Sequence, residues 1–178
     1  MSIAVIFPGQ GSQVVGMGVR LAKEFKVAKI LFDEIDDALN EKLSDIMKNG
    51  DEIKLQLTKN AQPALMATGI AVVKVIEKLS GKSITNIASH TAGHSLGEYT
   101  ALVASQSLKV SDAARLLRLR GLSMQSAVPV GMGGMVALIG VSIEDVEHFI
   151  ASVSNIKGVV EVANDNAPGQ VVISGDTR

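Results

Sequence analysis

The feature that most constrains this chain is the pentapeptide Gly93-His94-Ser95-Leu96-Gly97, which has the pattern G-x-S-x-G. It stands between a strand-like run, residues 85–92, and a helix-like run, residues 96–104. Two glycines allow a sharp turn that other residues resist, and such a turn presents the serine hydroxyl at a helix N-terminus. The backbone N–H groups and the helix dipole there favour negative charge. Although this short pattern often occurs by chance, it is typical of an α/β fold with a serine nucleophile for acyl transfer.

Composition narrows the class of protein. The chain has 178 residues, the length of one ordinary domain, with 17 basic and 18 acidic residues interspersed. That balance differs from the basic footprint of a nucleic-acid-binding protein. No apolar run approaches membrane-spanning length, and the N-terminal residues lack the basic flank of a signal peptide. The sequence has no cysteine, which excludes a thiol nucleophile and a cysteine zinc site. We therefore expect a soluble, cytoplasmic globular protein that binds neither nucleic acid nor membrane.

The apolar runs predict two parts. Residues 1–130 predict an α/β core with a first strand at 3–7 and the serine turn. Its expected helices cover residues 16–25, 29–47, 64–79, 96–104 and about 111–125. Residues 131–178 predict a strand, a helix that Ser142 caps, and two more strands joined by a turn at 164–169. This order is the first part of a ferredoxin-like unit, which needs a further helix and strand to close.

Ser95 needs a base, which is normally a histidine held by a third group. The histidines are His90, His94 and His148. His94 adjoins Ser95, and neighbours across such a turn point apart. His90 lies on the approaching strand, and His148 lies on a charged helix face. The sequence therefore supplies a nucleophile without a convincing base.

Arg120 is the residue that most suggests a ligand. On a helical wheel it falls on an apolar stripe, with Arg115 and Arg118 on the other side; the stripe also holds Ala113, Leu116, Leu117 and Met124. A cation there is costly unless an anion meets its guanidinium. The partner is either a structural carboxylate or a substrate carboxylate, unless the side chain simply snorkels to solvent. The residues alone leave these alternatives open.

Gln10 lies in a loop directly after the first predicted strand, where α/β folds place ligand-contacting groups. One interpretation is a turn residue between glycines. The other is a donor, through side chain or backbone, that stabilises an oxyanion together with the Leu96 backbone N–H.

Several motifs in the same order resemble bacterial malonyl-CoA:acyl carrier protein transacylases over the whole chain. They are Phe7-Pro8-Gly9-Gln10-Gly11-Ser12-Gln13, Gln62-Pro63-Ala64, Gly93 through Tyr99, Arg120-Gly121 with Met124-Gln125, and Asn164 through Gly175. The resemblance implies transfer of malonyl from coenzyme A to a serine, and from there to the phosphopantetheine thiol of acyl carrier protein. It also implies an α/β-hydrolase-like core with an inserted ferredoxin-like small subdomain.

The resemblance also implies roles for single residues. Ser95 is the nucleophile, Gln10 and the Leu96 backbone form the oxyanion hole, Arg120 binds the malonyl carboxylate, and His94 lines the site. Malonyl-CoA is a substrate, and neither a cofactor nor a metal is implied. The family's catalytic histidine comes from a segment after the small subdomain, which these residues lack. We therefore expect an N-terminal part of a longer enzyme that turns over poorly on its own.

Three alternatives differ in acyl group or in chemistry. An acyltransferase of polyketide synthase or malonate decarboxylase type would share the fold but use another acyl substrate. A serine hydrolase would deliver the acyl group to water. A non-catalytic binding protein would keep the serine turn as a relic.

Overall fold

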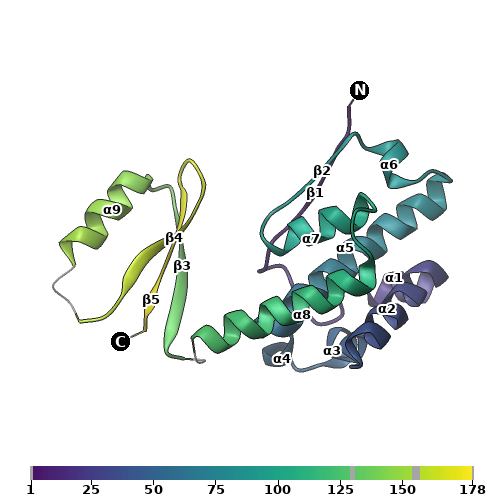
Figure 1. The fold of residues 1–178 in the computed structure, drawn as a ribbon, viewed down its shortest axis with the longest axis horizontal. Helices are drawn as coiled ribbons and strands as arrows, with labels where there is room; N and C mark the ends of the chain where they lie inside the picture. The colour runs from purple at the N-terminus through teal and green to yellow at the C-terminus, as the bar shows by residue number, and fades with distance from the viewer. Residues whose placement is uncertain (1, 129–130, 154–156, 178) are drawn as a thin grey trace. The chain divides into compact units, whose positions relative to one another are not determined.

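The computed structural model describes residues 2–128, 131–153 and 157–177 and shows a mixed α/β protein (Figure 1). The chain divides into two compact units, Met1–Gln125 and Ser126–Arg178, and the division falls in the last turn of helix α8 (Val110–Ala127). The boundary that the sequence predicts, between residues 130 and 131, adjoins residues 129–130, which lie outside the described residues.

The sheet of the first unit consists of two short parallel strands, β1 (Ala4–Phe7) and β2 (His90–Gly93). Ala4 lies opposite His90, and Phe7 lies opposite Gly93. The predicted strand at 85–92 is wrong in its first half, where residues 84–87 form a helical turn instead, α6 (Ile84–Ile87). The serine turn therefore follows a strand of only four residues, and Figure 1 shows β2 beside β1.

Helices surround this small sheet, and α5 is the central one. They are α1 (Val19–Glu24), α2 (Lys26–Leu39), α3 (Leu43–Asn49), α4 (Glu52–Gln56), α5 (Thr58–Ser80), α7 (Leu96–Ala104) and α8. α5 packs against α2 and α7. Its buried side chains, among them Met66 and Ile70, join Ile35 of α2 and Leu96 of α7 in one hydrophobic core. Burying a side chain of this size contributes about 1.5–3 kcal/mol, so α5 holds the unit together.

The predicted single helix at 29–47 is wrong, because the chain breaks at Asn40. Asn40 has a left-handed backbone with φ 50°, a conformation that asparagine tolerates better than most residues. The buried carboxylate of Asp36 accepts hydrogen bonds from the Ser44 N–H at 2.9 Å and the Ser44 hydroxyl at 2.5 Å. These bonds fix the start of α3, so Asp36 is a structural residue.

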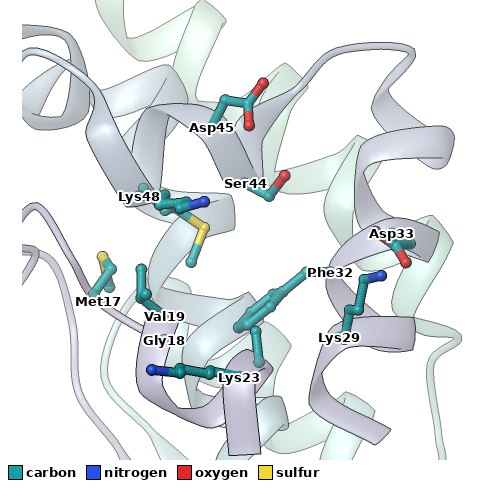
Figure 2. A pocket seen from close by; sticks show the side chains of 12 residues that line it. Met17, Gly18, Val19, Lys23, Lys29, Phe32, Asp33, Ser44, Asp45 and Lys48 are labelled. Carbon is teal, nitrogen blue, oxygen red and sulfur yellow. The ribbon is translucent and has the colours of Figure 1, made fainter. Parts of the chain in front are cut away.

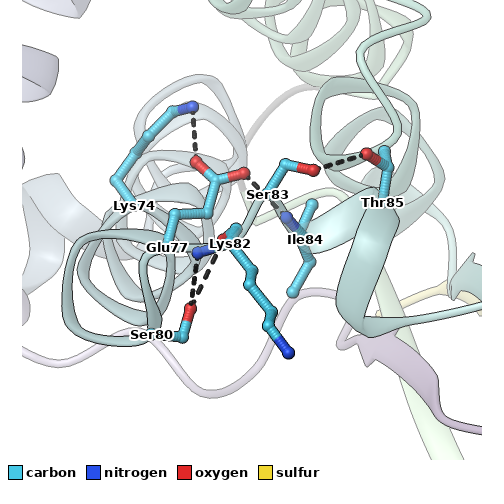
Figure 3. A network of polar contacts seen from close by, with 7 residues as sticks. All are labelled: Lys74, Glu77, Ser80, Lys82, Ser83, Ile84 and Thr85. Carbon is cyan, nitrogen blue, oxygen red and sulfur yellow. Dashed lines mark hydrogen bonds and ion pairs between the residues drawn. The ribbon is translucent and has the colours of Figure 1, made fainter.

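The end of α5 is held by a polar network that Figure 3 shows. The Glu77 carboxylate accepts hydrogen bonds from Lys74 Nζ and from the Ile84 N–H, each at 2.9 Å. α5 then ends at Gly81, whose φ of 67° suits glycine. Glu77 thereby fixes the start of α6 and the approach to β2.

The second unit contains a three-stranded antiparallel sheet and one helix. The elements are β3 (Gly133–Ile139), α9 (Ile143–Ser152), β4 (Val160–Ala167) and β5 (Gln170–Asp176), with strand order β3-β5-β4. The Ser142 hydroxyl accepts from the Asp145 N–H at 3.1 Å, so the predicted cap is confirmed. The predicted turn at 164–169 is shorter, because residues 164–167 extend β4 with two register shifts.

No helix in the described part of the chain is both long enough and apolar enough to cross a membrane.

The Glu77 network predicts a pH-dependent contribution to stability. Burial raises the pKa of the Glu77 carboxyl, but the Ile84 N–H and the Lys74 charge outweigh it, so the net pKa is lowered. A lowered pKa stabilises the fold above the unfolded value of about 4.3, and this stabilisation is lost as the pH falls through the folded value. Glu77→Gln should lower the free energy of unfolding by about 1 kcal/mol at pH 7.

The measurement is urea denaturation of wild type, Glu77→Gln and Glu34→Gln, an exposed control in α2, at pH 7 and pH 3. The Glu77→Gln deficit should shrink at pH 3, and the control should match wild type throughout. An equal deficit at both pH values would contradict the electrostatic explanation.

Candidate active site

The serine turn is tightly bonded to the end of β1. The His94 N–H donates to the Phe7 carbonyl at 3.1 Å. The Gly97 N–H donates to the His94 carbonyl at 2.9 Å, and the Glu98 N–H donates to the Ser95 carbonyl at 3.1 Å. Ser95 directly precedes α7 and has φ 56° and ψ −114°. That conformation is close to the first central position of a type II′ turn, which glycine normally occupies.

The two glycines of the pattern are required by contact as well as by turn geometry. A Cβ at Gly93 would overlap the Gly97 carbonyl group, and a Cβ at Gly97 would overlap the Phe7 carbonyl oxygen. Both obstructing groups are backbone, so they cannot swing away. The start of α7 therefore lies directly on the end of β1, and this approach brings Ser95 to the carboxyl edge of the sheet.

Arg120 extends from α8 to the serine. Its Nη2 donates to Ser95 Oγ at 3.0 Å, and its Nη1 donates to Gln62 Oε1 at 2.5 Å. Gln62, on α5, is fully buried. Among the ion pairs of the described residues none includes Arg120, so the guanidinium is held by neutral partners. A half-buried cation with neutral partners can still receive an anion.

The helical-wheel prediction for α8 is partly wrong. The buried side chains are Ala113, Ala114, Leu117, Arg118 and Gly121. Arg118, which was expected on the polar side, is only 8% exposed, whereas Leu116 and Met124 are exposed. Arg118 is buried because Asn60 and Glu41 pair with it. Arg120 therefore flanks the buried face of α8.

The two proposed oxyanion donors lie at the ends of β1 and β2. Leu96 is the first residue of α7, so its backbone N–H has no partner within the helix. Gln10 is exposed, and its Nε2 donates to Thr58 Oγ1 at 3.3 Å. The Gln10 side-chain amide is therefore directed at Thr58.

The histidines have different surroundings. A Cβ placed on Gly9 would come 2.5 Å from His94 Nδ1, so the His94 ring lies against the loop after β1. His90 Nδ1 lies 3.0 Å from Ser89 Oγ on the exposed side of β2. His148 lies on α9, in the second unit, and is exposed.

The described part of the first unit has a cavity at each of two places. One, of about 380 Å³, lies among α1, α2 and α3, and Figure 2 shows Phe32 and Met17 with the lysine side chains around it. None of its lining residues belongs to the serine turn. The other, of about 210 Å³, is lined by Phe7, Pro8 and Thr100 among others. Because Phe7 also bonds the serine turn, the smaller of these two cavities adjoins the candidate site.

Gln62 is the site residue to which sequence reasoning assigned no role. It appeared only within the motif Gln62-Pro63-Ala64, and a glutamine in an apolar segment was the available signal, because a buried amide needs partners. In the described residues no group of three or more His, Cys, Asp or Glu side chains could hold a metal ion.

Comparisons with known proteins give consistent matches. A family profile described as "Acyl transferase domain" matches residues 4–178. The malonyl CoA-acyl carrier protein transacylase of Bacillus subtilis is 48% identical over 176 residues, which are 99% of this chain and 54% of that protein. The crystal structure of the acyl-carrier-protein-S-malonyltransferase from Bartonella henselae is 52% identical with a TM-score of 0.90, covering 99% of this chain and 55% of that one.

A second similar structure is a malonyl-transacylase in complex with a type II PKS acyl-carrier protein. It is 41% identical with a TM-score of 0.87, covering 99% of this chain and 56% of the other. The chain thus spans about half the length of the curated relatives it matches.

Because Ser95 has a positive φ, replacing it by glycine should leave the protein more stable than replacing it by alanine. Ser95→Gly should raise the free energy of unfolding by about 1 kcal/mol relative to Ser95→Ala, because only glycine adopts this conformation without strain. Both variants lose the hydroxyl and its bond to Arg120, so their difference isolates the backbone. Urea denaturation measures it. Equal stability, or a more stable alanine variant, would show that the turn relaxes without cost.

Proposed function

The chain belongs to the acyl transferase domain family, and from this membership we propose that it carries the nucleophile and the acyl-binding part of a malonyl-CoA:acyl carrier protein transacylase. The relatives that share its sequence over nearly its full length bear that name. We place the enzyme in the cytoplasm, with malonyl-CoA as substrate and acyl carrier protein as partner. The activity needs no cofactor or metal.

One observation carries this proposal: the Arg120 guanidinium lies 3.0 Å from the Ser95 hydroxyl. A cation adjacent to the nucleophile suits an acyl group that ends in a carboxylate, since a guanidinium binds a carboxylate through two parallel N–H···O bonds. Malonyl is such a group. A guanidinium offers hydrogen-bond donors and no acceptor, so Arg120 binds and orients the acyl group and is not the base.

The reaction has two acyl transfers. Ser95 Oγ attacks the thioester carbonyl of malonyl-CoA, its proton passes to a base, and the coenzyme A thiol leaves with a proton. The phosphopantetheine thiol of the carrier protein then attacks the serine ester and restores the hydroxyl. The Gln10 and Leu96 N–H groups stabilise the oxyanion of each tetrahedral intermediate.

The base in this proposal is a histidine from a part of the family's chain that has no counterpart in these 178 residues. His94 lines the site beside Gly9 and supports the turn. Assayed by themselves, residues 1–178 should form the serine ester slowly and turn over poorly, because none of them is proposed as the base.

The fold proposal follows the same family. The parallel pair β1-β2 with the serine turn at its carboxyl edge supports an α/β-hydrolase-like core. The strand order β3-β5-β4 with α9 supports the first part of a ferredoxin-like subdomain. In that proposal a further strand would pair with the free edge of β3.

An acyltransferase of polyketide synthase type is the second candidate, and the structure with a type II PKS acyl-carrier protein supports it. Both candidates use the same residues when the acyl group is malonyl. Transfer of uncharged acyl groups fits less well, because it has no use for Arg120.

The nucleophile is tested by mass spectrometry of the intact protein after incubation with malonyl-CoA. We expect a malonyl adduct on wild type and none on Ser95→Ala, because only the hydroxyl can form the ester. Ser123→Ala, on α8, is a matched control that should keep the adduct. An adduct that persists in Ser95→Ala would contradict the assignment of the nucleophile.

Acyl selectivity tests Arg120. Arg120→Ala should reduce the malonyl adduct by about 10²-fold, since a charge-assisted bidentate contact contributes roughly 1.5–3 kcal/mol. The acetyl adduct from acetyl-CoA should stay within about threefold, as acetyl has no carboxylate. Unchanged malonyl-to-acetyl selectivity would show that Arg120 does not bind the carboxylate.

A further inference from the structure

Arg118, a second arginine of α8, donates a hydrogen bond to a side-chain amide of α5, as Arg120 does. Arg118 Nη1 donates to Asn60 Oδ1 at 2.5 Å, as Arg120 Nη1 donates to Gln62 Oε1 at the same distance. Residues two apart on a helix are rotated by roughly 200°, so each arginine lies on its own flank of the α5–α8 contact. Between these flanks a Cβ at Gly121 would come 2.5 Å from Lys59 Cα, which shows that the two helices meet at their backbones.

Pro63 of α5 leaves a backbone carbonyl that Arg118 can bond. Proline has no N–H, so the carbonyl four residues earlier, that of Lys59, receives no intrahelical hydrogen bond from it. Arg118 Nη1 donates to this Lys59 carbonyl at 2.6 Å. The bond ties α8 to the same turn of α5 that carries Gln62.

The surroundings of Arg118 fix it firmly. Its Nη2 lies 2.9 Å from Glu41 Oε2, and Asn60 is itself held by a bond from its Nδ2 to the Lys54 carbonyl at 2.7 Å. Burial lowers the pKa of the Arg118 guanidinium, and the Glu41 charge opposes this. Neither Nε nor Nη2 has a hydrogen-bond acceptor among the described residues, so Nη2 meets Glu41 as an ion pair without hydrogen-bond geometry. Truncation of such a group leaves buried partners unpaired.

We propose that Arg118 is a positioning residue: it fixes the rotation of α8 about its axis and thereby holds the Arg120 guanidinium beside Ser95. A guanidinium lies roughly 6 Å from its helix axis, so a rotation of about 10° displaces it by about 1 Å. Displacements of about 1 Å can cost on the order of 10²-fold in rate. That the positioned cation serves a substrate carboxylate rests on the proposed function.

The test follows the Nε–Hε signal of Arg120 by NMR in protein labelled with ¹⁵N-arginine, assigned by its loss in Arg120→Lys. In Arg118→Met the signal should shift or broaden, because the guanidinium no longer has one position. Arg115→Met, an exposed arginine of the same helix, is the matched control and should leave it unchanged. Arg118→Lys, which keeps a cation and a donor, should restore most of the wild-type signal.

Malonate is then titrated into each variant as a probe of the carboxylate site. Arg118→Met should weaken malonate binding about tenfold, with no change in Arg115→Met. Lower stability alone leaves the affinity of the folded protein unchanged, so a merely structural role predicts wild-type affinity. A folded Arg118→Met with wild-type signal and affinity would overturn the proposal.

The proposal can still be tested if malonate does not bind wild type or if Arg118→Met does not fold. If malonate does not bind wild type, the proposed function fails. The Arg120 signal in Arg118→Met still shows whether Arg118 positions Arg120. If Arg118→Met does not fold, Glu41→Ala replaces it, because Glu41 is half-exposed. Glu41→Ala should shift the Arg120 signal in the same direction by a smaller amount, and an unchanged signal there would overturn the proposal.

Discussion

The backbone contact between α7 and β1 is the constraint on which the candidate site depends. Gly97 lies so close to the Phe7 carbonyl that no side chain fits, and the same carbonyl accepts the His94 N–H. These two contacts, rather than the length of the sheet, determine where α7 begins. A parallel pair of four-residue strands would otherwise define the edge poorly. Because Ser95 is the residue between the strand and the helix, its strained backbone is imposed by both of its neighbours.

The second constraint is the burial of polar groups at the start of α5. Asn60 and Gln62 are both buried, and a buried amide destabilises the fold unless its groups are paired. Arginine suits this role because its guanidinium offers several donors in fixed directions. Asn60 and Gln62 each accept from one arginine of α8. The contact between α5 and α8 therefore has polar pairs as well as the close backbone approach at Gly121, while Ala113, Ala114 and Leu117 of α8 pack into the core.

The sequence correctly predicted those features of the fold that depend on residues close together in the chain. The G-x-S-x-G turn, the start of α7 at Leu96 and the Ser142 cap follow from residues close together in the chain. Two of the errors arose where partners in other helices or beyond the next turn decide the structure. Glu77 holds the start of α6, seven residues on, and makes a helical turn where a strand was expected. Arg118 is buried because Asn60 and Glu41 pair with it, and a helical wheel includes no partner from another helix.

Arg120 and Arg118 lie on the same helix and carry the same functional group, but their partners differ. Arg118 has a carboxylate within 2.9 Å, so its charge is balanced within the protein. Arg120 has an amide and a hydroxyl instead. Its charge therefore remains available to a ligand, at the atom where acyl transfer is proposed to occur. A cation with no acidic partner among the described residues costs free energy, and this cost decreases when an anionic group binds. The proposed selectivity for a carboxylate therefore rests on Arg120, whereas Arg118 already has Glu41 as its acidic partner.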